Sequence, residues 1–315
     1  EELLKLGQEN PNNAADPLNM AVLALRLSGS TNGVSALHGE VSRRMWSGLW
    51  PDVPESEIPI RHVTNGVHSP TWFSTEIAEL YRKHLGNGWL EHPTDPGAWE
   101  KVAEIPDEEL WRVHTHCKGT LIRFARKRLK EQLDRSGAHP QEFTQVDEVL
   151  DPDALTIGFA RRFATYKRAT LLFRDIERLK RLLTSADRPV QIVFAGKAHP
   201  RDNQGKELIR QIIQVSRQPE FRRRVVFIQD YDILVARHMV QGVDIWLNNP
   251  RRPLEASGTS GMKSTANGVL NFSVLDGWWC EGYNGKNGWV IGEGEDYEDS
   301  EYQDSVESHA LYNLL

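Results

Sequence analysis

Four short apolar runs follow one another between residues 154 and 248: ALTIGFA (154–160), VQIVFAG (190–196), RVVFIQD (224–230) and VDIWLN (243–248). Their length and their β-branched and aromatic residues are typical of buried strands. The segments between them are amphipathic, and we predict helices at 168–185, 204–217 and 232–241. Strands and helices that alternate in this way predict an α/β fold, a Rossmann-like doubly wound parallel sheet covered by helices.

The segments on either side predict a helical start and a polar end. Residues 17–47 carry apolar side chains at helical spacing after Asp16-Pro17, a capping and first-turn pair, so we predict one helix there. Residues 51–75 predict a loop with short turns. Residues 107–134 predict a long amphipathic helix. The acidic segment 292–305 is expected to be solvated or to begin a helix.

The composition is that of an ordinary globular protein. The 315 residues suffice for two domains, and 39% of them are hydrophobic. A net charge of −6 gives no general attraction to nucleic acid or to an anionic membrane, and no apolar run approaches the roughly 20 residues of a membrane span. Two cysteines imply no disulfide framework, so we predict a cytoplasmic protein. The chain does not start with Met, and we expect it to begin inside a longer protein.

The run EASGTSGMK (255–263) sets one lysine, Lys263, just past a loop of small residues. Glycine frees the backbone to direct several N–H groups at an anion, and a helix that starts near Met262 would add its positive end. The hydroxyls of the run come from Ser257, Thr259 and Ser260. A phosphate beside a reactive amine indicates pyridoxal 5'-phosphate, held as a Schiff base on Lys263. Taken alone, the run also fits a surface turn with a solvated lysine.

Four cations follow the first predicted strand: Arg161, Arg162, Lys167 and Arg168. Arginine offers a planar fork for phosphate and lysine a point charge, so the cluster could hold both a cofactor phosphate and a substrate phosphate. The alternative is a basic helix start that faces water. Two histidines, His114 and His116, are two residues apart, which on a helix directs them to different faces, so no metal site is expected.

The longer run EASGTSGMKSTANG resembles the cofactor-lysine segment of the α-glucan phosphorylases, the family of glycogen, starch and maltodextrin phosphorylases. Together with residues 224–263, four more segments fit that family in the expected order: SGSTNGVSALHGEVSRRMW (28–46), HVTNGVHSPTW (62–72), GFARRFATYKRA (158–169) and VFAGKAHPRDNQGKELI (193–209). The match covers most of the chain from about residue 18 to residue 292. It is closer to the shorter bacterial and archaeal branch than to the animal and plant enzymes.

The resemblance implies a GT-B type architecture, with a cofactor-binding domain preceded by the helical end of a truncated first domain. We expect residues 1–118 to be the C-terminal part of that first, glucan-binding domain. Residues 119–315 are expected to be the Rossmann-like domain for pyridoxal phosphate, truncated at its end. Family members are considerably longer, so the chain is expected to be a central fragment that carries the cofactor half of the site and could be inactive alone.

The resemblance also implies roles for individual residues. Lys263 would carry the cofactor, while Arg162 and Lys167 would bind the substrate phosphate, and these three are the candidate catalytic residues. Further cofactor contacts are implied for Thr259, Ser260, Arg161 and Tyr231. Sugar contacts are implied for Glu255, Ser257, Gly258 and Tyr166. Animal-type members have a sugar-binding histidine where this chain has Gly29 or a neighbour, so a backbone group is expected to substitute there. Read alone, Glu255 is equally a plain surface carboxylate.

The implied reaction is reversible phosphorolysis by a pyridoxal-phosphate-dependent glycosyltransferase of carbohydrate metabolism. Inorganic phosphate would release the terminal α-1,4-linked glucose of a glucan as glucose 1-phosphate, with the cofactor phosphate acting in proton transfer. The partners are then an α-1,4-glucan and phosphate. A homo-oligomer of the full-length protein and allosteric control are compatible with the family but are not indicated by the residues.

Three other interpretations remain open. The first is a catalytically silent glucan-binding protein. The second is a nucleotide-sugar glycosyltransferase of the same architecture, which would use a diphosphate leaving group and no cofactor lysine. The third is an aminotransferase, which also uses a lysine, although the order of elements gives no sign of that fold.

Overall fold

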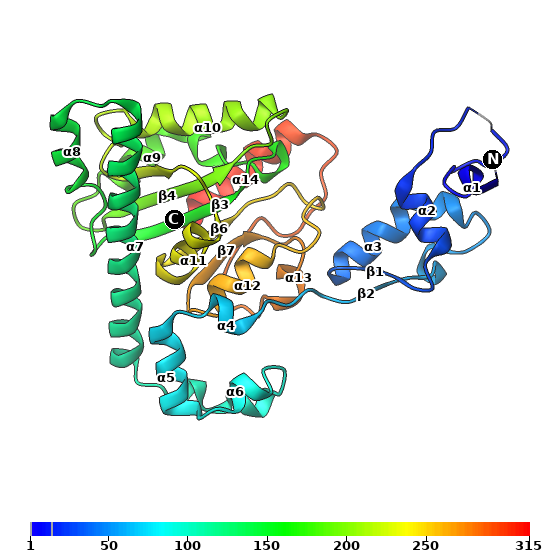
Figure 1. Ribbon diagram of the computed structural model, residues 1–315, viewed down its shortest axis with the longest axis horizontal. Helices are drawn as coiled ribbons and strands as arrows, with labels where there is room; N and C mark the ends of the chain where they lie inside the picture. Colours follow the sequence, from blue (N-terminus) through cyan, green and yellow to red (C-terminus); the bar gives the residue numbers. More distant parts are fainter. Residues whose placement is uncertain (1, 14) are drawn as a thin grey trace. The chain divides into compact units, whose positions relative to one another are not determined.

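The computed structural model describes residues 2–13 and 15–315 (Figure 1). The chain divides into two compact units. Unit 1 comprises Glu1–Asn65, Pro253–Gly258 and Asp276–Gly282. Unit 2 comprises Gly66–Arg252, Thr259–Leu275 and Tyr283–Leu315. The segment EASGTSGMK (255–263) therefore passes from unit 1 to unit 2 between Gly258 and Thr259.

Unit 1 consists of short helices beside one pair of parallel strands, β1 (Thr31–Gly33) and β2 (Ile60–His62). Its helices are α1 (Glu2–Lys5), α2 (Met20–Leu27), α3 (Ala36–Met45) and α13 (Trp279–Gly282), with 3-10 turns at Ser47–Leu49 and Glu55–Glu57. The segment 51–75 is mostly short turns, as predicted, apart from β2 and the four-residue helix α4 (Ser69–Trp72) of unit 2.

The single helix predicted for residues 17–47 is wrong, because β1 interrupts it. The residues from Ser28 to Gly33 are Ser, Gly, Thr and Asn, which are weak helix formers that favour caps and turns. The first helix is capped by Asn19, whose side chain accepts from the N–H of Ala21, and not by Asp16. The second is capped by Ser35, whose hydroxyl accepts from the N–H of His38.

Unit 2 is built on a six-stranded parallel sheet, which confirms the predicted α/β class. The strands are β3 (Leu155–Arg162), β4 (Val190–Lys197), β5 (Val225–Ile228), β6 (Ile245–Asn248), β7 (Leu270–Val274) and β8 (Gly288–Ile291). Their order is β5-β4-β3-β6-β7-β8. Counted in chain order, this is the 3-2-1-4-5-6 arrangement of doubly wound dinucleotide-binding sheets. The order reverses between β3 and β6, and ligands of such sheets bind outside the carboxyl ends of the strands at that point.

Helices cover both faces of this sheet. On one face, α9 (Ile176–Leu183), α10 (Asn203–Ser216) and α14 (Ser300–Leu314) share a core with alternate strand residues such as Phe159 and Phe194. On the other, α7 (Asp107–Ser136) and α11 (Ile233–Gly242) pack against Val193 and Trp246. Figure 1 shows α7 as the long helix beside the sheet. Its start agrees with the prediction for residues 107–134, and Gly137 ends it in the left-handed conformation.

The remaining elements of unit 2 are short. They are α5 (Thr75–Leu85), α6 (Gly88–Glu91), α8 (Pro140–Val146), α12 (Thr259–Thr265) and 3-10 turns at Pro96–Glu104, Thr165–Lys167 and Leu171–Asp175. The helix predicted for 168–185 is thus a 3-10 turn followed by α9, and the acidic segment leads into α14. The predicted domain boundary after residue 118 lies within α7, and the division into domains stays a prediction.

Two strands of the six-stranded sheet, β7 and β8, escaped prediction. The first carries Asn271 and Ser273, which are polar but buried, so its sequence lacks the continuous apolar run of the other core strands. Both side chains are hydrogen-bonded: Asn271 to Thr265 of α12, and Ser273 to Asn248 of β6. These polar residues therefore join β7 to α12 and to the carboxyl end of β6.

Candidate functional site

Arg161 lies at the carboxyl end of β3, beside the point where the strand order reverses. Its side chain is buried. The guanidinium donates to Asn248 Oδ1 and, over 3.1 Å, to the carbonyl oxygen of Leu247, both in β6. It also lies over the ring of Phe159, 4.7 Å from the centroid. These contacts hold one positive charge in a fixed place at the switch point.

Tyr231 follows β5 and is partly buried. Burial raises the pKa of its phenol, and the positive charge of Arg161 opposes that rise. The two predicted cofactor-binding residues are therefore electrostatic neighbours, although 70 positions separate them in the sequence.

The loop after β3 carries the other predicted cations. Arg162 is exposed at the end of the strand, whereas Tyr166 and Lys167 lie in the 3-10 turn. The ammonium of Lys167 is 4.7 Å from the centroid of the Tyr166 ring. Arg168 was grouped with the cations that could bind phosphate. Its side chain is instead buried and ion-paired to Asp304 and Glu307 of α14.

Lys263 is a partly buried residue of α12, which begins at Thr259, three residues before the predicted start near Met262. Its Nζ lies 4.0 Å from the centroid of the Trp72 ring. Burial lowers the pKa of the amine, so a larger fraction is neutral near pH 8 than for a solvated lysine. A neutral primary amine is the form that attacks a carbonyl carbon.

Trp72 was not singled out from the sequence, although it ends the quoted segment HVTNGVHSPTW. Its position is fixed through Asn267, whose Nδ2 donates to the carbonyl oxygens of Trp72 and Lys263, each over 2.9 Å. The Oδ1 of Asn267 accepts from the N–H of Ser74 over 2.8 Å. One buried amide therefore joins the aromatic residue to the helix that carries the lysine.

The first turn of α12 supplies the two predicted phosphate-contacting hydroxyls. Thr259 lies four residues before Lys263, so both side chains share one face of the helix. Ser260 Oγ accepts a hydrogen bond from Trp246 Nε1 of β6 over 3.2 Å. The helix is thereby attached to the same strand that anchors Arg161.

The predicted sugar-contacting residues other than Tyr166 belong to unit 1. Glu255 is 8% exposed, and its N–H donates to Asp276. The carbonyl oxygen of Ser257 accepts from the N–H of Trp278 over 2.8 Å. Gly277 has a φ of 54°, and a Cβ there would lie 2.4 Å from the Ser257 carbonyl oxygen, so this close approach requires glycine.

Ser257 and Gly29, two of the residues predicted to contact the sugar, differ in burial. The Ser257 hydroxyl is buried and has no hydrogen-bond partner among the described residues, so a water or a ligand is needed to satisfy it. Gly258 follows it with a φ of 79°. Gly29 is exposed, and a Cβ added there would meet no described atom within 4 Å. Gly29 is thus not part of a closed pocket within unit 1.

The two histidines considered as metal ligands lie in α7 of unit 2. His114 pairs with Asp244 at 2.5 Å and His116 with Glu76 at 3.6 Å, so each histidine has its own partner. Among the described residues, no group of three or more His, Cys, Asp or Glu side chains could hold a metal ion. No helix in this part of the chain is long and apolar enough to cross a bilayer.

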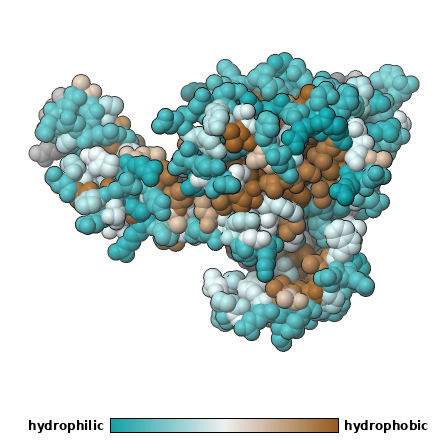
Figure 2. Space-filling view, turned by 180° about the vertical axis from the view of Figure 1, so that it is seen from behind, coloured by the Kyte–Doolittle hydropathy of each residue, from teal (hydrophilic) through white to brown (hydrophobic). Residues whose placement is uncertain are grey.

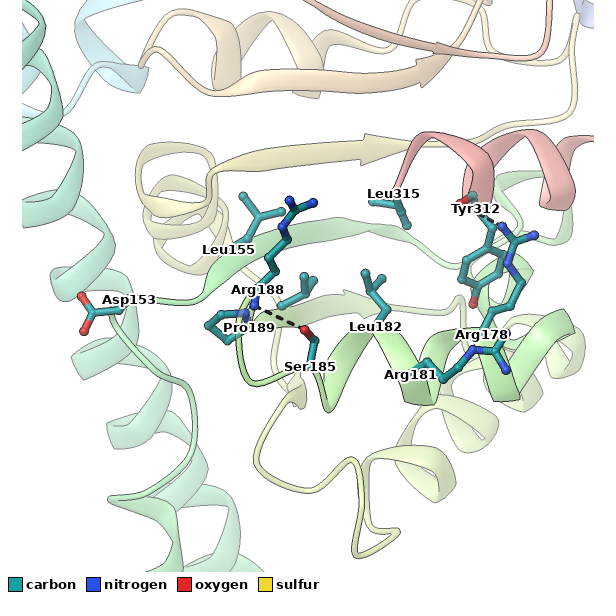
Figure 3. A pocket seen from close by; sticks show the side chains of 11 residues that line it. Asp153, Leu155, Arg178, Arg181, Leu182, Ser185, Arg188, Pro189, Tyr312 and Leu315 are labelled. Carbon is teal, nitrogen blue, oxygen red and sulfur yellow. Dashed lines mark hydrogen bonds between the residues drawn. The ribbon is translucent and has the colours of Figure 1, made fainter.

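Two cavities lie at the opposite, amino edge of the sheet. One, of about 580 Å³, is shown in Figure 3, where Arg178 of α9 lies beside the ring of Tyr312 in α14. The other, of about 710 Å³, is lined in part by Leu155, Ile245 and Leu270 at the starts of three strands. Figure 2 shows hydrophobic side chains gathered in a band across the part of the molecule that contains the sheet. Neither cavity contains a predicted site residue.

The comparisons with known proteins bear on the whole chain. A sequence profile of the family described as Carbohydrate phosphorylase matches residues 8–285. The chain belongs to the carbohydrate phosphorylase family. It is 50% identical to the maltodextrin phosphorylase of Thermococcus litoralis and 48% identical to the glycogen phosphorylase of Aquifex aeolicus. The glycogen phosphorylase of Mycobacterium bovis is 44% identical.

Each of these similarities extends over the whole of this chain but only part of the relative. The aligned share is 37% of the Thermococcus protein, 44% of the Aquifex protein and 36% of the Mycobacterium protein. This carbohydrate phosphorylase chain therefore spans less than half the length of the relatives it matches. Membership of the family agrees with the parallel sheet covered by helices, whereas the chemistry of the whole protein is a separate inference.

Proposed function

We propose that the protein containing this chain is an α-1,4-glucan phosphorylase, which releases the terminal glucose of a glucan as glucose 1-phosphate by reaction with inorganic phosphate. The observation that carries the proposal is the partly buried, pKa-lowered amine of Lys263 at 4.0 Å from the Trp72 ring, in a chain of the carbohydrate phosphorylase family. The names of the relatives, maltodextrin phosphorylase and glycogen phosphorylase, agree with this substrate class.

The donor set of unit 2 fits pyridoxal 5'-phosphate. Lys263 would hold the aldehyde, the Trp72 ring beside it would give the site an apolar wall, and Thr259 and Ser260 would hydrogen-bond the phosphate. Arg161, fixed by Asn248, would offset the negative charge. When bound, this cofactor would supply a phosphate group that exchanges a proton with the substrate phosphate. Tyr231 would limit access of water on the side of Arg161.

The remaining residues would act on the substrates. Arg162 and Lys167, on the loop after β3, would bind inorganic phosphate and offset its repulsion from the cofactor phosphate. Tyr166 would contact the glucosyl unit. In unit 1, Glu255, Ser257, Gly258 and the backbone near Gly29 would contact the sugar. The Ser257 hydroxyl, which has no partner among the described residues, would offer both a donor and an acceptor. We place this enzyme in the cytosol, where the thiols of Cys117 and Cys280 would stay reduced.

The test is an assay of the full-length protein with maltodextrin and inorganic phosphate. We expect glucose 1-phosphate to form and the glucan to shorten by one unit per turnover. Glucan binding without turnover would favour a silent glucan-binding protein. Glucosyl transfer from a nucleotide sugar, without phosphorolysis, would favour the glycosyltransferase alternative, and either result would overturn the proposal.

The replacement Asn248→Leu is expected to weaken cofactor binding. It removes the side-chain acceptor that holds Arg161, so the guanidinium would lose its fixed place. We expect roughly a tenfold rise in the dissociation constant for pyridoxal phosphate, as for loss of one hydrogen bond to a charged group. Absorbance titration of the cofactor-free full-length protein measures it.

The matched control for this change is Ser273→Ala. It removes the 3.0 Å hydrogen bond from Asn248 Nδ2 to the Ser273 hydroxyl and the bond from that hydroxyl to the Val274 carbonyl oxygen, and it leaves the contact of Asn248 with Arg161 in place. The control should bind the cofactor about as well as the unmodified protein. Equal affinities for the Asn248→Leu and Ser273→Ala proteins would contradict the role given to Asn248.

A further inference from the structure

We propose that Arg168 is a positioning residue, which fixes the loop carrying Arg162, Tyr166 and Lys167 through buried ion pairs with α14. The inference rests on the proposed function, because the loop is taken to bind the substrate phosphate. According to this inference, Arg168 does not bind the phosphate itself. Helix α14, near the end of the sequence given, helps to position the residues that do.

The guanidinium of Arg168 is 2% exposed and makes four hydrogen bonds. Nε donates to the carbonyl oxygen of Asn249 and Nη2 to that of Pro250, each over 2.8 Å. Nη1 donates to Asp304 Oδ1 over 3.1 Å, and Nη2 also donates to Glu307. With these groups occupied and excluded from water, Arg168 is not free to bind a substrate.

The backbone of Arg168 ends the 3-10 turn. Its φ is 51°, in the left-handed region that a non-glycine residue rarely adopts, and its N–H donates to the Thr165 carbonyl oxygen over 3.0 Å. The Arg168 carbonyl oxygen accepts from Asn249 Nδ2 over 3.0 Å. The unfavourable conformation is stable only where surrounding contacts determine it, and here they come from both the main chain and the side chain.

A second arginine shares the same carboxylate. The N–H of Arg251 donates to the Tyr166 carbonyl oxygen over 2.8 Å, and its side chain donates to Asp304 over 3.1 and 2.5 Å. Glu307 accepts from Gln303 over 3.0 Å. The segment 249–251 after β6 is therefore joined both to the loop after β3 and to α14, so the two loops that follow the switch-point strands are held as one body.

This arrangement has a consequence for phosphate binding. Because Tyr166 and Lys167 immediately precede Arg168, release of the arginine would let the turn move and displace the Lys167 ammonium. The glucan-contacting residues of unit 1 and the lysine of α12 are not among the partners of Arg168. The affinity for phosphate should then suffer while the cofactor stays bound.

The experiment compares two arginine replacements in the full-length protein. Arg168→Lys keeps a charge but cannot make four fixed hydrogen bonds, and we expect the KM for phosphate to rise roughly tenfold or more, since small displacements of binding groups have large kinetic effects. The KM for maltodextrin and the cofactor absorbance should stay unchanged. The matched control, Arg174→Met, removes an exposed ion pair between the turn at Leu171–Asp175 and Glu301 of the same helix, and should leave all these values unchanged.

A second readout does not depend on activity. Hydrogen exchange of the amides at 162–168 should quicken in the Arg168→Lys protein and not in the control. If Arg168→Lys does not fold, Asp304→Asn and Glu307→Gln each weaken one side of the same contact and should give smaller shifts of both quantities in the same direction.

The outcomes separate the inference from the function on which it rests. A full-length protein that forms no glucose 1-phosphate overturns the proposed function, while faster exchange confined to the loop would still support the positioning role. An active protein whose Arg168→Lys variant keeps both its phosphate KM and its loop exchange overturns the inference. Equal changes in both KM values together with the loss of cofactor absorbance would show a general structural role instead and would also overturn it.

Discussion

Replacement of Lys263 by alanine in the full-length protein is expected to abolish both the cofactor absorbance and the formation of glucose 1-phosphate. The amine is the only group at that position that can bond the cofactor covalently, and alanine leaves no amine beside the Trp72 ring. We expect activity to fall by at least about a thousandfold, the scale for removal of an essential group. An absorbance scan between roughly 330 and 420 nm and a phosphorolysis assay measure the two effects.

Two further variants make this result specific. Lys263→Arg keeps a positive charge but cannot bond the aldehyde, so it should also lose the absorbance. Lys180→Ala removes a surface amine of α9 that pairs with Glu220, and it should keep both the absorbance and the activity. Retained activity in the Lys263→Ala protein would refute the role of this lysine.

The replacement Asp244→Ala is expected to destabilise unit 2 by about 3–5 kcal/mol, the cost of removing one partner from a buried ion pair. Asp244 accepts from His114 at 2.5 Å, from Lys118 at 3.0 Å and from the N–H of Thr156 at 2.7 Å. The Lys118 side chain is 5% exposed, so its ammonium would be left buried without its carboxylate. These bonds connect α7 to β3 and to the start of β6, and their loss should loosen both contacts.

Native-state hydrogen exchange along α7 measures this change as the free energy of local opening. The matched control is Lys130→Ala, which breaks an exposed pair between α7 and Asp147, with side chains 40% and 63% exposed. Exposed pairs contribute about 0–1 kcal/mol, so α7 should keep nearly all of its protection in the control. Equal protection in the Asp244→Ala and Lys130→Ala proteins would contradict the importance of the buried cluster.

The same carboxylate gives a pH dependence with a definite sign. Burial alone would raise the pKa of Asp244, but the hydrogen bond from His114 and the Lys118 ammonium lower it below the ordinary value of 3.8. A carboxyl whose pKa is lower in the folded state contributes stability above its unfolded pKa and loses it as the pH falls through the folded pKa. The stability difference between the unmodified protein and Asp244→Asn should therefore persist at neutral pH and shrink below about pH 4.

Much of the sheet could be predicted from the sequence because its first four strands are continuous apolar runs between amphipathic helices. The strand β7 could not, since Asn271 and Ser273 look solvent-facing until the partners on α12 and β6 are known. The break between α2 and α3 was missed because helical spacing of apolar residues outweighed the small polar residues at 28–33.

For the candidate site, the sequence identified residue types but not their environments. Arg168 resembled its neighbours as a phosphate-binding cation, and only the fold brings it to Asp304 and Glu307, which lie 136 and 139 residues further along the chain. Trp72 and Asn248 were missed for the same reason. Only the fold shows that the Trp72 ring lies beside Lys263 and that the Asn248 amide binds Arg161. Local patterns do not encode such distant contacts.

The central claim is that the amine of Lys263 carries the cofactor. The most direct measurement is borohydride reduction of the full-length protein as purified with its cofactor, followed by peptide mapping by mass spectrometry. We predict one pyridoxyl group, on the peptide that contains Lys263. A pyridoxyl group on a different lysine, or none on a protein that phosphorolyses glucan, would contradict the account.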